Sequence, residues 1–229
     1  MHTADLLETV RTDHDTALSR LGSSKSVFAL TAGDMEPDAV LAAMATEARL
    51  AADLIGGWAD DAGGGGEKAG GGVEEAGGEI DDDAAGDLGV AFAGAADTLA
   101  AQADAIAGRL EGVEPESESA VLSFLGGLDG DVERAGGLLG WALVADRRNT
   151  QVTGFFTGQA DPQTASLFRG FGDDYDEVLE TVGSALEDSC DGDSDWAAAE
   201  EAAVGAVEAA YDDYVETLES MGVNPKPVC

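Results

Sequence analysis

The chain has 229 residues, and 47 Asp and Glu against 11 Lys and Arg give it a formal net charge of −36 at pH 7. This excess of acid excludes the basic patches through which proteins bind DNA, RNA or anionic membranes, and a hydrophobic content of 44% argues against a disordered acidic chain. Because molar salt shortens the Debye length to roughly 3 Å and so screens repulsion among carboxylates, we expect a halophilic protein.

The first helix is predicted over residues 3–21, where apolar side chains and one histidine recur at spacings of three and four. These positions are Leu7, Val10, His14, Ala17 and Leu21. Gly22 is a plausible stop for this helix, and a short apolar segment with Val27, Phe28 and Leu30 follows it.

The next helix has clear start signals, because Asp34 is a capping residue and Pro37 falls in the first turn. Its inward positions form one stripe: Val40, Met44, Glu47, Ala51, Leu54 and Trp58. A carboxylate among apolar neighbours is unusual, since Glu is rarely buried without a partner. Glu47 is therefore the first candidate functional residue.

The periodic pattern disappears between residues 63 and 87, a stretch built from Gly, Glu, Asp and Ala. We predict a flexible, solvated insertion here, with one short helical turn near residues 73–80. A third helix is predicted over residues 88–110, and its stripe contains one polar member, Gln102. The full stripe is Phe92, Ala95, Leu99, Gln102, Ile106 and Leu110.

Residues 119–147 are predicted to form one long helix or two abutting ones. The glycines at 126, 127, 136, 137 and 140 weaken a helix by about 1 kcal/mol each relative to Ala, but they also allow close contact with a neighbouring helix. Residues 149–158 form a small separate segment.

Two further helices complete the chain. Asp161 and Pro162 supply the N-cap and first residue of one of them, and the last helix starts near Asp195 and ends at Gly222. Residues 223–229 form an extended tail, and no stretch shows the alternation of a strand. We therefore expect one all-α domain over residues 1–229, a bundle of five or six helices.

The sequence predicts no targeting segment and no membrane-spanning segment. Its start lacks a basic flank and an apolar stretch, and the apolar run at 135–145 is shorter than the about 20 residues that span a bilayer. Two cysteines, Cys190 and Cys229, are too few for a disulfide framework. We expect a cytoplasmic protein with reduced thiols and no membrane contact.

The acidic run Asp191-x-Asp193-x-Asp195 imitates the start of a calcium-binding EF-hand loop. Such a loop needs Gly at its sixth position and Glu at its twelfth, where this chain has Trp196 and Ala202. A solvated turn is the better interpretation.

The sequence offers few candidate bases for nucleophilic catalysis, because His2 lies at the start of the chain and His14 lies on a helix stripe. We interpret His14 as a packed histidine. The reactivity of Cys229, at the end of the tail, stays open.

Glu47 and Gln102 are the informative pair, since each is the polar member of an apolar stripe. Helical bundles that hold two iron or manganese ions use Glu-x-x-His on two helices, and the i, i+3 spacing aims both side chains inward. The corresponding positions here are Glu47 with Leu50, and Leu99 with Gln102. One Glu and one Gln are too few ligands for a di-iron centre.

Two interpretations of Glu47 remain open. It is either the remnant of a degenerate metal site or a carboxylate at the edge of its stripe by coincidence, beside Arg49 or paired with Arg109.

Four segments are distinctive as strings: TALSRLGSSKS at 16–26, GDMEPDAV at 33–40, ADPQTASLF at 160–168 and NPKPVC at 224–229. Together they resemble a haloarchaeal rubrerythrin-like family, members of which are often labelled transcription antitermination proteins. The resemblance covers most of the chain except the Gly/Asp-rich insertion. It implies a ferritin-like fold, an up-down four-helix bundle with one or two extra helices, and di-iron redox chemistry.

The sequence departs from that chemistry, because Leu50 and Gln102 stand where histidines are needed and no CxxC pair is present. Our leading hypothesis is a non-catalytic binding or regulatory module with a degenerate di-metal site and no cofactor. One alternative is a rubrerythrin-like oxidoreductase that holds iron or manganese in an atypical carboxylate site. A second is a transcription antitermination factor that acts through a protein partner, without direct nucleic-acid contact. A protein partner or a homo-oligomer is compatible with each hypothesis.

Overall fold

The computed structural model describes residues 1–63, 82–110 and 119–226, and within these ranges the chain is helical and has no strand. This confirms the all-α class. Five of the nine helices in the described ranges are long and four are short. In chain order they are α1 (Thr3–Asp13), α2 (Asp15–Leu21), α3 (Ser24–Leu30), α4 (Pro37–Gly63), α5 (Asp82–Ala107), α6 (Ala120–Leu125), α7 (Asp131–Gly158), α8 (Pro162–Ser189) and α9 (Asp193–Ser220).

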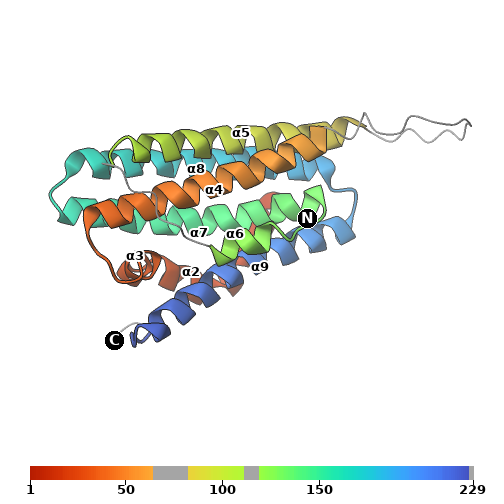
Figure 1. Cartoon of the computed structure of the whole chain (residues 1–229). Helices are drawn as coiled ribbons and strands as arrows, with labels where there is room; N and C mark the ends of the chain where they lie inside the picture. Colours follow the sequence, from red (N-terminus) through yellow and green to blue (C-terminus); the bar gives the residue numbers. More distant parts are fainter. Residues whose placement is uncertain (64–81, 111–118, 227–229) are drawn as a thin grey trace, which may run out of the picture.

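Four long helices pack side by side around one apolar interior (Figure 1). Helix α4 packs along α5, α5 packs against α8, and α8 packs along α7, while lighter contacts between α4 and α7 close the group. The fifth long helix, α9, packs on another side of α7 and crosses it at an angle in Figure 1. The short helices α1, α2, α3 and α6 all contact α9. Helix α7 is therefore central, with partners on several sides.

The central position of α7 explains the apolar run seen in the sequence. Residues 135–145 are buried without interruption, as expected of a helix that is covered all round. None of the helices in the described ranges combines the length and apolarity needed to cross a membrane.

The predicted stripes agree well with the buried faces. On α5, Gln102 and its four apolar neighbours from Phe92 to Ile106 are all buried. On α4, the stripe is confirmed at both ends, where Val40 and Trp58 are buried, but between them Ile55 is fully buried and Leu54 only in part. Because about 3.6 residues make one turn, residues 18 apart lie on the same side of the helix, so the difference at 54 and 55 is local.

The first predicted helix, over residues 3–21, is wrong as a single element. It consists of α1 and α2, which are separated at His14. The residues around the break, from Asp13 to Thr16, are all weak helix formers. The apolar segment around Phe28 is itself helical and forms α3.

For residues 119–147 the sequence left open whether one long helix or two abutting helices form. Two helices are present, α6 and α7, and the Gly-containing stretch 126–130 separates them. The small separate segment expected at 149–158 is wrong, because these residues continue α7 to Gly158. Val152 and Phe156 extend its buried face there, so tertiary packing overrides the weak helix propensity of the local sequence.

Helix α5 begins six residues earlier than predicted, at Asp82. Residues 82–87, the last part of the insertion expected at 63–87, therefore belong to the helix. The short helical turn expected at 73–80 lies outside the described residues.

The expected start of α8 is confirmed. The Asp161 carboxylate accepts hydrogen bonds from the backbone N–H groups of Gln163 and Thr164, at 3.1 and 3.0 Å. Helix α9 starts at Asp193, two residues before the predicted position, and ends at Ser220. Only residues 223–226 of the predicted tail belong to the described chain.

Candidate functional site

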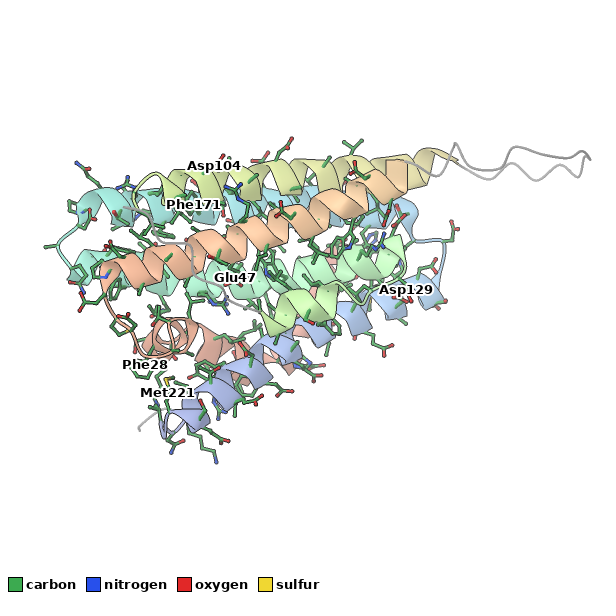
Figure 2. All side chains as sticks on the ribbon, in the orientation of Figure 1. Phe28, Glu47, Asp104, Asp129, Phe171 and Met221 are labelled. Atoms are coloured by element: carbon green, nitrogen blue, oxygen red, sulfur yellow. The ribbon has the colours of Figure 1, made fainter. Side chains whose placement is uncertain are left out.

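Glu47 lies at mid-length on α4, on the side that faces α7 (Figure 2). Its side chain is only 12% exposed, and it forms an ion pair with Arg148 of α7, which is 11% exposed. The Nη1 atom of Arg148 donates a hydrogen bond to Oε2 of Glu47. An ion pair this deep is costly to desolvate, and each charge depends on the other to remain there.

The two arginines considered as partners of Glu47 lie elsewhere. Arg49 pairs with Asp104 of α5 on the exposed surface, and Arg109 donates a hydrogen bond to the hydroxyl of Thr164 at 3.1 Å. The predicted pairing of Glu47 with either arginine is therefore wrong. The partner comes from the facing helix α7 and not from a residue near one of the two stripes.

The four packed helices each contribute a polar side chain to one small cavity of about 10 Å³. These side chains are Glu47 from α4, Gln102 from α5, Arg148 from α7 and Tyr175 from α8. The remaining walls are apolar or aromatic: Met44, Ala48, Ile106, Trp141, Ala145 and Phe171. A volume of this size is close to that of one water molecule.

Gln102 is 2% exposed, and its Nε2 atom donates a hydrogen bond of 2.9 Å to the Asp174 carboxylate of α8. The two polar stripe members therefore do meet at one cavity. Their expected companions do not join them: Leu50 is 39% exposed and lines a different cavity, and Leu99 is fully buried among apolar residues.

The small cavity holds one full positive and one full negative charge. Tyr175 adds no charge, because its hydroxyl stays protonated. Burial raises the pKa of this hydroxyl, and the nearby negative charge of Glu47 raises it further. Among the described residues, Trp141 Nε1 and Arg148 Nε are buried donors without a hydrogen-bond partner. Both residues line this cavity, where one bridging water can satisfy such donors.

A larger cavity of about 200 Å³ lies on the other side of the ion pair, and Glu47 and Arg148 line both cavities. Its walls come from α2, α3, α4, α7 and α9, and from Ala32 and Ser119, which lie outside the helices. A third charged residue, Asp213 of α9, lines it as well. Asp213 is an exposed residue, yet partial desolvation of its carboxyl raises the pKa of that group; the Arg148 charge lowers this pKa and the Glu47 charge raises it.

The other candidates from the sequence that the structure describes line neither of these two cavities. Asp195, in the loop that imitates an EF-hand, accepts a hydrogen bond from the backbone N–H of Asp191 at 2.9 Å. His14 lies at the break between α1 and α2, with Nδ1 3.9 Å from Glu208 Oε1. Burial raises the pKa of the Cys190 thiol to about 11, and Cys229 lies outside the described residues.

Sequence reasoning missed Arg148, Tyr175 and Asp213. Of these three, Arg148 has a local signal in the sequence, because its position continues the spacing of Ala142 and Ala145 by three more residues. Arg148 falls just outside the predicted helix, which ends at 147.

Within the described ranges, the structure has no group of three or more His, Cys, Asp or Glu side chains placed to hold a metal ion. Comparison with protein-family models, curated proteins and solved structures finds no match to this chain.

Proposed function

We propose that the chain is a ferritin-like helical bundle whose metal position has been replaced by an ion pair, and that it acts as a non-catalytic binding or regulatory module in a salt-rich cytoplasm. The observation that carries this proposal is the Glu47–Arg148 pair at the centre of four packed helices. The convergence of one polar side chain from each of these helices supports the ferritin-like part.

The charges at the small cavity argue against a metal there. Iron and manganese sites in bundles use several carboxylates with imidazoles, which together offset the charge of the ions. The small cavity offers Glu47 with Gln102 and an un-ionised Tyr175. The Arg148 guanidinium already neutralises Glu47, and its positive charge repels a second cation at this distance.

The place of the pair supports a binding role. Its charged groups are held between a cavity of water size and one of about 200 Å³, and the larger cavity has room for a compact ligand. A ligand in the larger cavity would contact the same two side chains that join α4 to α7. Binding there could therefore bias the packing of these helices.

Metal analysis tests the proposal against the oxidoreductase alternative. The protein is purified in molar KCl, incubated with Fe²⁺ or Mn²⁺ under anaerobic conditions, desalted and analysed for bound metal. Variant Glu47→Ala removes the central carboxylate, and Glu201→Ala, an exposed glutamate of α9, is the matched control.

We expect little metal per chain, and equal amounts in the wild type and both variants. Stoichiometric iron or manganese that is lost in Glu47→Ala and kept in Glu201→Ala would overturn the proposal in favour of a metal-dependent oxidoreductase.

A further inference from the structure

The larger cavity combines apolar and polar walls with three charged side chains, two of them negative. Leu21, Leu30 and Ala210 supply apolar surface, while Thr217 and Asp213 supply polar groups from α9. A volume of about 200 Å³ exceeds the roughly 150 Å³ that suffices for a benzene molecule in a dry protein cavity. A ring or short alkyl group with one polar arm therefore fits.

The three charged side chains of this cavity do not cancel. Glu47 and Arg148 neutralise each other through their hydrogen-bonded ion pair. Asp213 is exposed, and within the described ranges no hydrogen bond or direct ion pair joins it to another side chain, although the Arg148 charge lowers the pKa of its carboxyl. The cavity therefore carries a net charge of about −1 at neutral pH when Asp213 is ionised.

We propose that this cavity binds a small organic cation, whose ammonium group faces Asp213 and whose apolar part lies against Leu21, Leu30 and Ala210. This inference deepens the proposed binding function and rests on it. An ammonium group has three N–H donors, and the Thr217 hydroxyl lies one helical turn from Asp213 on the same cavity wall.

An organic anion fits this cavity poorly. The Nη1 atom of Arg148 is already engaged by Glu47, and an anion would approach two carboxylates, Glu47 and Asp213, in a chain of net charge −36. A hard metal cation fits poorly too, since Mg²⁺ and Ca²⁺ require six or more oxygen ligands close together. A monovalent cation with an apolar body satisfies both the charge and the walls.

The position of the pair gives the ligand a means to act on the fold. Asp213 lies on α9, Glu47 on α4 and Arg148 on α7, so one ligand contacts three long helices. Partial desolvation raises the pKa of the exposed Asp213, and a bound ammonium group would offset this cost of ionising it.

Calorimetric titration with benzylamine tests this assignment. The full-length protein is titrated in molar KCl, where weak attraction of cations to the acidic surface is screened. Variant Asp213→Asn removes the cavity charge without a large change in size, and Asp212→Asn removes a neighbouring exposed charge that does not line the cavity. Benzyl alcohol and benzoate serve as the neutral and anionic probes of the same ring.

We expect the wild type to bind one benzylamine saturably, with about tenfold or greater weakening in Asp213→Asn and little change in Asp212→Asn. Benzyl alcohol should bind about tenfold or more weakly than benzylamine, and benzoate should bind least. Circular dichroism checks that each variant is folded.

Three results would overturn the assignment: no saturable benzylamine binding, equal losses in both Asn variants, or tighter binding of benzoate. None of them bears on metal content. If the protein binds neither metal nor benzylamine, only the ligand assignment is overturned. If it binds metal in a way that depends on Glu47, the proposed function itself is overturned.

Discussion

Gly136 of α7 faces Ala199 of α9 so closely that a Cβ atom on Gly136 would lie 2.1 Å from the Ala199 carbonyl oxygen. One turn further, a Cβ on Gly140 would lie 2.2 Å from the carbonyl oxygen of Ala203. The two helices therefore pack backbone to backbone along a seam of small residues, as the glycines in the sequence suggested. This seam fixes the distance between α7 and α9, and thus how far Asp213 lies from Arg148.

Variant Gly136→Ala should destabilise the fold, because the new methyl group forces α7 and α9 apart. We expect a loss of about 1–3 kcal/mol or more in the free energy of unfolding, measured by urea denaturation in molar KCl. Gly154→Ala, in the same helix but with open space around its Cβ position, is the control and should gain up to about 1 kcal/mol. Equal stability of the two variants would show that the seam is not tightly packed.

The Glu47–Arg148 pair should behave as a coupled unit in a double-mutant cycle. Glu47→Leu leaves Arg148 buried without its partner, and Arg148→Met does the same to Glu47, so each should cost about 3–5 kcal/mol. The double variant should be more stable than either single variant, because no unpaired charge remains. Urea denaturation measures all four proteins.

The exposed pair of Arg49 with Asp104 is the control for that cycle. Arg49→Met should change stability by about 1 kcal/mol or less, since exposed ion pairs contribute little. Strictly additive losses from Glu47→Leu and Arg148→Met would contradict the coupling.

The cap of α8 should respond to pH. Hydrogen bonds from Thr164 lower the pKa of Asp161 below its ordinary value of 3.8, so the folded state favours the ionised form. This contribution to stability is present above pH 3.8 and is lost as the pH falls through the lowered pKa of the folded state. Asn also caps helices but does not titrate in this range.

We therefore expect the wild type to exceed Asp161→Asn in stability most clearly near neutral pH. The difference should shrink as the pH drops below 3.8, when both proteins are followed by urea denaturation at a series of pH values. A difference that stays constant over this range would mean that the Asp161 charge does not act through the cap.

The net charge of −36 should make the fold depend on salt. In dilute buffer the Debye length grows several-fold over that in molar KCl, and repulsion among carboxylates then opposes the compact state. We expect helical circular dichroism to fall when the protein is dialysed from molar KCl into dilute buffer, and to return on adding KCl. Full retention of the signal in dilute buffer would contradict a halophilic protein.

Local signals were enough to place most elements of the fold. Asp161 and Pro162 marked the start of α8 because capping uses only neighbouring residues, and the stripe from Phe92 to Ile106 marked the buried face of α5 because periodicity is local. Where Asn149 and its neighbours lack strong propensity, α7 continues only because neighbouring helices bury Val152 and Phe156.

Local patterns are enough to identify an acidic, all-helical chain with two polar residues, Glu47 and Gln102, set in apolar stripes. The partners of these two residues follow only from helix packing: Arg148 lies 101 residues from Glu47, and Asp174 lies 72 residues from Gln102. Spacing along one helix fixes which side chains share a face. The identity of the residue across the interface depends on how separate helices pack, and no pattern within either helix specifies that.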